Sequence, residues 1–217
     1  SRLQGLFDQQ GQSPWLDNLR RGWISSGELQ VLIDRGVRGI TSNPSIFQKA
    51  MTGTDDYDEQ LSALAGAGRS IEDSYWELVT RDIVDALDLL RPVHEATHGL
   101  DGFVSVEVDP SLAADTGGTE AAARHLSRII DRPNLFVKIP ATAEGIPAIR
   151  TMIGEGCSVN VTLIFSLDRY EDVMEAYIAG LEAHEGDLSG TSSVASFFIS
   201  RTDSEIDRRL EAVGTPE

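Results

Sequence analysis

The sequence predicts an α/β fold built on a parallel sheet, and three features of the chain support this prediction. Short β-like runs alternate with longer helical patterns, no low-complexity linker interrupts them, and 217 residues suit one α/β domain or two small ones. This alternation is typical of strands joined by crossover helices. Such strands form either an open doubly wound sheet or part of an eight-stranded barrel.

The predicted strands are short apolar runs bounded by turn-forming residues. We expect six of them, at Trp15 to Asn18, Gly39 to Ser42, Phe103 to Asp109, Leu135 to Pro140, Ser158 to Phe165 and Val194 to Ile199.

Several of the intervening helices carry start signals. Ser26 is expected to cap one helix, and a longer helix is expected to start near Ser70 and to be disturbed by Pro92. A further apolar helical stripe, from Tyr170 to Leu181, follows Ser166. The sequence Thr202-Asp203-Ser204-Glu205 fits a capping box, which predicts that the last helix begins there. The long helix after Ser70 should turn one apolar face inward, formed by Ile71, Leu78, Ile83, Leu87 and Leu90.

Polar residues recur at every second position in two of the predicted strands. In one strand Ser105, Glu107 and Asp109 alternate with valines. In the other, Val159, Val161, Leu163 and Phe165 are expected on one face and Ser158, Asn160 and Thr162 on the opposite face. Parallel sheets are normally covered on both faces, so these polar rows are better explained by a cavity than by an exposed sheet edge.

A single lysine, Lys138, interrupts the apolar run Leu135 to Pro140. Burial favours the neutral form of an amine, which can attack a carbonyl carbon and form an imine. Imine chemistry also needs nearby acids and bases, for which Asp17, Glu107 and Asp109 are candidates. A structural ion pair between Lys138 and Glu107 is an equally good interpretation of the spacing alone.

Composition argues against several functional classes. The 35 acidic and 18 basic residues give a formal charge of −17, which disfavours nucleic acid and anionic membranes as partners. We find no apolar run long enough to span a membrane and no secretion signal, and the single cysteine, Cys157, cannot form an internal disulfide. A cytoplasmic location is the simplest expectation.

Four segments resemble signatures of the transaldolase family, in matching order and spacing. They are Ser13–Asn18, Thr41–Phe47, Phe136–Gly145 and Asn160–Ser166. The resemblance covers nearly the whole chain from about residue 12 and is to the long bacterial form. It implies a (β/α)8 barrel of the TIM type, of which six of the eight strands are recognisable here.

The resemblance also implies roles for individual residues. Lys138 matches the Schiff-base lysine, Asp17 the carboxylate that removes a hydroxyl proton during aldol cleavage, and Glu107 with Thr162 the pair that holds a catalytic water. The substrate-binding positions implied in the same way are Asn43 and Asn160 for the dihydroxyacetone hydroxyls, Ser196 and Phe198 as pocket-lining residues, and Arg201 for phosphate.

The implied reaction belongs to the pentose phosphate pathway and needs no cofactor or metal. A dihydroxyacetone unit passes from sedoheptulose 7-phosphate or fructose 6-phosphate to glyceraldehyde 3-phosphate or erythrose 4-phosphate. We expect residues 1–217 to form a single barrel-type domain that lacks its C-terminal βα units, and therefore to turn over weakly by itself. The oligomeric state is not predictable from the sequence.

Two alternative functions remain. His94-Glu95-Ala96-Thr97-His98 spells the pattern of zinc hydrolases, in which two histidines one helical turn apart bind the metal. Pro92 and Gly99 on either side argue for the end of a helix instead. The second alternative is a barrel fragment that binds sugar phosphates without transferring them.

Overall fold

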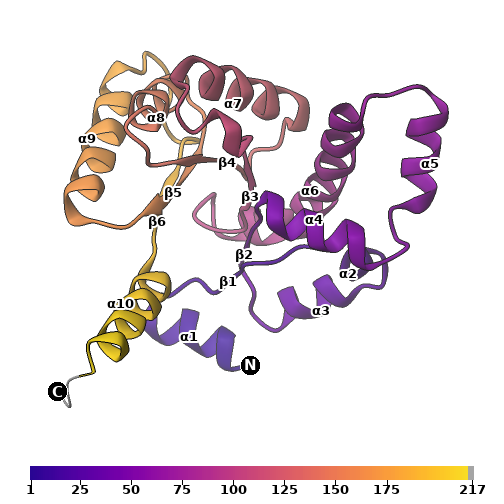
Figure 1. The fold of residues 1–217 in the computed structure, drawn as a ribbon, viewed down its shortest axis with the longest axis horizontal. Helices are drawn as coiled ribbons and strands as arrows, with labels where there is room; N and C mark the ends of the chain where they lie inside the picture. Colours follow the sequence, from indigo (N-terminus) through magenta and orange to yellow (C-terminus); the bar gives the residue numbers. More distant parts are fainter. Residues whose placement is uncertain (215–217) are drawn as a thin grey trace. The chain divides into compact units, whose positions relative to one another are not determined.

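The computed structural model describes residues 1–214, and in this range strands and helices alternate as predicted (Figure 1). The strands are β1 (Trp15–Leu16), β2 (Gly39–Thr41), β3 (Val104–Glu107), β4 (Leu135–Pro140), β5 (Val159–Ile164) and β6 (Ser193–Phe197). The helices are α1 (Arg2–Gln10), α2 (Arg21–Ser25), α3 (Glu28–Asp34), α4 (Pro44–Gly53), α5 (Asp58–Gly66), α6 (Ile71–Ala96), α7 (Thr116–Ile130), α8 (Gly145–Gly154), α9 (Leu167–Ala183) and α10 (Ile199–Val213). A short 3-10 turn, Pro110–Leu112, precedes α7.

The strands form one sheet whose spatial order follows the sequence, β1-β2-β3-β4-β5-β6. The pairs β1–β2, β2–β3 and β5–β6 are parallel. A doubly wound sheet reverses its strand order at a switch point, whereas a (β/α)8 barrel keeps the order of the sequence. The observed order is therefore that of a partial barrel, and the predicted fold class is confirmed.

The chain divides into two compact units, with boundaries inside α7 and β4. The first unit holds residues 1–109 and 125–137, and its core contains the side chains of Ile40 and Leu87. Three aromatic rings stack in this unit: Phe136 lies between Trp15, at 6.1 Å between ring centroids, and Phe103, at 4.1 Å. The apolar runs predicted as strands therefore form the interior of the unit.

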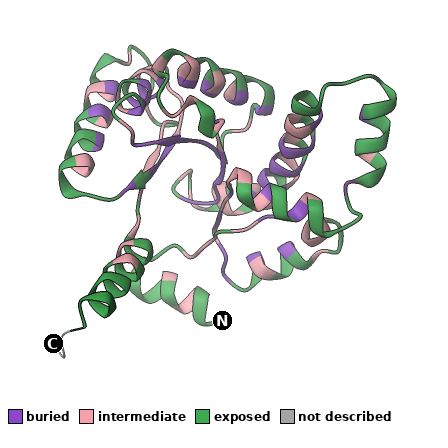
Figure 2. Ribbon diagram, viewed as in Figure 1, coloured by how far each residue is buried: buried purple, intermediate pink, exposed green. Residues whose placement is uncertain are grey.

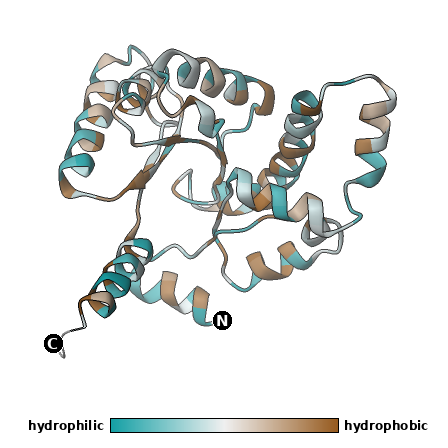
Figure 3. Cartoon of the chain, viewed as in Figure 1, coloured by the Kyte–Doolittle hydropathy of each residue, from teal (hydrophilic) through white to brown (hydrophobic). Residues whose placement is uncertain are grey.

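The second unit holds residues 110–124 and the chain from Lys138 onward. Helices α8 and α9 contribute Ile149, Ile153 and Val173 to its core, and β5 contributes Val159 and Val161. These buried segments are also apolar in sequence, whereas α10 is mostly exposed and hydrophilic (Figures 2 and 3). Within residues 1–214, no helix is both long and apolar enough to cross a bilayer.

The helix start expected near Ser70 is confirmed in atomic detail, and a second serine caps a helix in the same way. The hydroxyl of Ser70 accepts a hydrogen bond from the Asp73 amide at 3.0 Å, and α6 begins with the next residue. Ser166 caps α9 in the same way, accepting from the Arg169 amide at 3.2 Å. These caps depend only on neighbouring residues, so a helix start of this kind can be predicted from sequence.

Other helix predictions are wrong or only partly confirmed. The last helix begins at Ile199, before the predicted capping box, and the Thr202 hydroxyl donates instead to the Phe198 carbonyl at 2.8 Å. Pro92 lies inside α6, which continues to Ala96. The predicted apolar face of α6 is buried from Leu78 onward, but Ile71 in its first turn is 91% exposed.

The start of α3 also differs from the prediction. Its N-cap residue is Gly27, with φ of 80°, and the helix begins at Glu28. Ser26 lies one residue earlier and accepts a long hydrogen bond, 3.4 Å, from the Glu28 amide. The serine therefore lies beside the helix start without capping it.

A buried polar network links three segments of the first unit. Asp82, on α6, accepts hydrogen bonds from Arg21 Nε at 2.8 Å and from the Tyr57 hydroxyl at 2.7 Å. The Arg21 guanidinium also lies over the Tyr57 ring, at 4.3 Å from its centroid. Arg21 is the first residue of α2, so this network fixes the segment that follows β1.

Strand β5 contains one extra residue relative to β6. Val161 pairs with Ala195 and Ile164 pairs with Phe197, so Thr162 and Leu163 together face the single residue Ser196. Leu163 adopts φ of 59°, in the left-handed region that residues other than glycine rarely enter. This arrangement is a β-bulge.

Candidate active site

Lys138 lies in the middle of β4, where every residue of the strand is buried. Its side chain is 6% exposed, and its neighbours Val137 and Ile139 are 1% and 0% exposed. The strand therefore places an amine in the interior, as the apolar run of the sequence predicts.

Two of the predicted site residues of the first unit meet at one narrow pocket. Asn43, two residues after β2, and Glu107, the last residue of β3, line it together with Tyr75 of α6. The Asn43 side-chain oxygen caps α4 by accepting from the Ile46 amide at 3.0 Å. The cap occupies the oxygen, so the NH₂ group is the part of this amide that can donate to a ligand hydroxyl.

The pocket of Asn43 and Glu107 is electronegative. Burial, the largest cause, and the negative charges of Asp109 and Glu107 together raise the pKa of Tyr75 to about 12. Both carboxylates of the polar row predicted on β3 therefore act on the same phenol.

Asp17 lies at a separate cavity of the first unit. This cavity has a volume of about 400 Å³, and Arg20 and Lys49 also line it. Asp17 follows β1 directly and is exposed. Within the first unit, Asn43 and Glu107 are thus brought together, and Asp17 shares its cavity with two cations that the sequence analysis did not single out.

In the second unit, β5 and β6 bring three predicted residues to one place. The Ser196 hydroxyl donates to Asn160 Oδ1 at 2.8 Å, which fixes the orientation of the buried Asn160 amide. Thr162 is 1% exposed, and its hydroxyl has no hydrogen-bond partner among the described residues. A buried hydroxyl without a partner is costly, and a ligand or a bound water would satisfy it.

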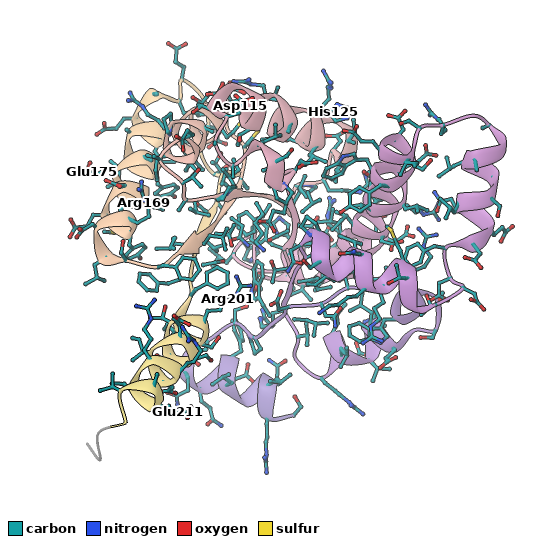
Figure 4. All side chains as sticks on the ribbon, in the orientation of Figure 1. Asp115, His125, Arg169, Glu175, Arg201 and Glu211 are labelled. Carbon is teal, nitrogen blue, oxygen red and sulfur yellow. The ribbon has the colours of Figure 1, made fainter. Side chains whose placement is uncertain are left out.

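Phe198 and Arg201 lie where β6 passes into α10. The Arg201 guanidinium carbon is 4.5 Å from the centroid of the Phe198 ring. Arg201 is the third residue of α10, so it lies inside the first helical turn and does not precede the helix as the sequence analysis predicted. Its side chain is exposed at this end of the helix (Figure 4).

The first histidine of the zinc-hydrolase pattern, His94, has a structural role. His94 Nδ1 lies 2.9 Å from the Asp101 carbonyl oxygen, and its ring packs edge-on against Phe103. Among residues 1–214, no cluster of three or more His, Cys, Asp or Glu side chains could hold a metal ion. The geometry gives the zinc interpretation no support.

Parallel strands in sequential order, each followed by one or more helices, together with a buried lysine on the fourth strand, define a protein of the TIM-barrel class. Residues 14–216 match the family described as Transaldolase/Fructose-6-phosphate aldolase. The chain belongs to this family.

The relatives with curated names are bacterial. The chain is 57% identical over 217 residues to the transaldolase of Saccharopolyspora erythraea, with 98% of this chain and 58% of the relative covered. It is 54% identical to transaldolase 1 of Streptomyces coelicolor, with 99% and 57% covered, and 54% identical to the transaldolase of Thermobifida fusca, with 100% and 60% covered. The chain thus spans about three fifths of the length of these relatives.

Three residues at these pockets were missed by the sequence analysis. Tyr75, Arg20 and Lys49 line the pockets of the first unit, but each lies in a helix or a connecting segment. Helical periodicity marks which residues face a core and does not mark which of them reach a pocket. Only their polar or cationic character was available as a signal.

Proposed function

We propose that the complete gene product transfers a dihydroxyacetone unit from a ketose phosphate to an aldose phosphate through a Schiff base on Lys138. The donors are sedoheptulose 7-phosphate or fructose 6-phosphate, and the acceptors are glyceraldehyde 3-phosphate or erythrose 4-phosphate. The observation that carries the proposal is the burial of Lys138, 6% exposed in an apolar strand, in a chain of this family. We propose the cytoplasm as the site of the reaction.

The first half of the reaction divides the donor sugar. The neutral Lys138 amine attacks the ketone carbon, and loss of water from the carbinolamine gives a protonated imine. Asp17 removes the proton of the hydroxyl on the carbon that becomes the new aldehyde. The bond between this carbon and the dihydroxyacetone unit then breaks, and its electron pair moves into the imine to give an enamine. The aldose phosphate leaves.

The second half of the reaction runs the same steps in reverse with a new acceptor. The enamine carbon attacks the acceptor aldehyde, and the alkoxide regains a proton from Asp17. Water then hydrolyses the imine and frees Lys138. We assign Glu107 and Thr162 to this water; the buried Thr162 hydroxyl, which lacks a hydrogen-bond partner among residues 1–214, supports the assignment.

Substrate binding is assigned to five side chains. The amides of Asn43 and Asn160 bind the dihydroxyacetone hydroxyls, and Ser196 orients the second amide through its hydrogen bond of 2.8 Å. Phe198 lines the pocket. Arg201 binds the phosphate group, because a guanidinium donates two parallel hydrogen bonds to phosphate oxygens.

Borohydride trapping tests the proposal. The complete protein is incubated with fructose 6-phosphate, reduced, digested and examined by mass spectrometry, and we expect a stable adduct at Lys138. Within residues 1–217 the one other lysine is Lys49, which provides a matched control. Lys138→Ala should abolish both the adduct and the turnover, whereas Lys49→Ala should retain the adduct on Lys138.

The outcomes separate the alternatives. An adduct at Lys49, or no adduct in the wild-type protein, contradicts the proposed mechanism. An adduct at Lys138 without transfer to an aldose phosphate, measured in a coupled assay, would instead support binding without transfer. The same assay on residues 1–217 alone reports whether this part of the protein, which spans about three fifths of the relatives' length, is sufficient for turnover.

A further inference from the structure

The β-bulge in β5 reverses the alternation of side chains along the strand. Before the bulge, Val159 and Val161 are each 0% exposed, and after it Ile164 takes the buried position with 0% exposure. Leu163 and Phe165 are 37% and 48% exposed. A regular strand would have buried these two beside the valines.

Phe165 therefore lies on the other face of β5 from the one predicted. Two residues of β5 face Ser196, so Phe165 falls on the side that carries Asn160 and Thr162. Pairing with β6 continues beyond the bulge, because the Phe198 amide donates to the Ile164 carbonyl at 2.9 Å. The expectation that Phe165 shares a face with the valines is wrong.

The displaced ring completes a stack of three groups. The rings of Phe165 and Phe198 lie 5.2 Å apart between centroids at an interplanar angle of 23°, and the Arg201 guanidinium carbon is 4.5 Å from the Phe198 centroid. Phe198 follows Ser196 by two residues in extended backbone, so it continues the row that begins with the hydrogen bond to Asn160. The stack joins the two strands to the first turn of α10.

We propose that Phe165 is a positioning residue for the phosphate group of the sugar substrate. It holds the Phe198 ring, and this ring in turn supports the Arg201 guanidinium that binds the phosphate. In this interpretation, the bulge at Leu163 places Phe165 on the face of β5 that carries Asn160 and Thr162. This inference rests on the proposed function, in which Arg201 binds phosphate.

The test compares a phosphorylated substrate with one that has no phosphate. In the complete protein, Phe165→Leu keeps an apolar side chain and removes the ring. The KM for fructose 6-phosphate should rise by about three- to ten-fold, the size of effect expected from the loss of one stacked aromatic pair, with little change in kcat. Borohydride trapping of dihydroxyacetone on Lys138 should keep its wild-type yield, since this ligand has no phosphate.

Two further variants sharpen the comparison. Phe165→Tyr retains the ring and should restore the KM to near the wild-type value. Leu167→Ala removes an apolar side chain that is 71% exposed and lies two residues away, outside the stack, and it should leave the KM unchanged. Calorimetric titration with inorganic phosphate should show weaker binding to Phe165→Leu by the same factor, independently of turnover.

The inference is overturned if Phe165→Leu raises the KM for fructose 6-phosphate no more than Leu167→Ala does. It is also overturned if dihydroxyacetone trapping falls by the same factor as the affinity for fructose 6-phosphate, because that pattern indicates a general structural defect. Failure of the proposed function is seen separately, as absent trapping in the wild-type protein.

Discussion

Replacing Asp82 with alanine is expected to destabilise the protein by about 3 kcal/mol. Asp82 is 0% exposed and is the shared acceptor for Arg21 and Tyr57, whose donor atoms lie at 2.8 and 2.7 Å. Alanine leaves both donors without this acceptor. The Arg21 side chain is only 18% exposed, so water cannot fully replace the lost partner.

The magnitude follows from the burial of the network. Removing one partner of a buried ion pair costs about 3 to 5 kcal/mol, and we take the lower end because Asp82 is itself penalised by burial. Burial raises the pKa of Asp82 despite the opposing hydrogen bonds from Tyr57 and Arg21. For a chain of this size, about 3 kcal/mol lowers the Tm by about 6 to 12 °C.

Thermal unfolding followed by circular dichroism measures the effect, with Asp85→Ala as the matched control. Asp85 lies one turn further along α6 and forms an exposed pair with Arg81 at 2.9 Å, so its loss should shift the Tm by no more than about 1 °C. If Asp82→Ala and Asp85→Ala lower the Tm equally, the argument from burial is refuted.

The pH dependence gives a second check on Asp82. A folded-state pKa above the unfolded value means that the folded form holds its proton more tightly, so the contribution to stability is present at low pH and is lost as the pH rises through the folded pKa. Asp82→Asn removes this titration and should flatten the decline of the Tm over the acidic range. A decline identical to that of the wild type would contradict the assignment.

Two further predictions concern the neighbourhood of the site. In Gly145→Ala the new Cβ would lie 2.0 Å from the Pro140 carbonyl oxygen, so the variant should lower both the Tm and the yield of trapping on Lys138. The control is Gly154→Ala at the other end of α8, where the new Cβ meets only ordinary contacts and both quantities should stay unchanged. Equal effects of the two variants would contradict this prediction, because they would show that the backbone at the end of β4 moves to accept the new Cβ. Tyr75 should ionise near pH 12 instead of its usual value near 10, and its contribution to stability should be lost as the pH rises between these values. Ultraviolet titration of the wild type, compared with Tyr75→Phe, measures this ionisation. Ionisation of Tyr75 near pH 10 would contradict the prediction.

The sequence predicted the repeating parts of the fold because they depend on local patterns. Apolar runs identified all six strands, with each end within two residues of its observed position, and the long helix starts near Ser70 as expected. Lys138 could be predicted as buried because its neighbours on both sides are apolar. These features depend on the spacing of apolar residues along the chain and on residues that are close in sequence.

The errors arose where pairing between distant segments decides the outcome. Leucine has no preference for positive φ, so nothing local in β5 marks Leu163 as the residue that leaves the regular register. The four residues from Thr202 satisfy the pattern of a capping box, but extended backbone at Phe198 allows α10 to start earlier. Tyr75 reaches a pocket from α6 only because of the way that helix packs in the first unit.

The extra residue in β5 also limits how this strand can be transferred or compared. A protein engineer who grafts Asn160 and Thr162 onto another barrel with a regular strand would turn Phe165 outward, although every residue of the motif is present. A deletion of one residue after Val161 would instead remove the bulge and leave Phe165 on its present face, since Ile164 would still pair with Phe197. Two chains can therefore have identical residues in this motif and still present different surfaces to a ligand. The outcome depends on whether one residue of the partner strand pairs opposite two residues of the motif strand.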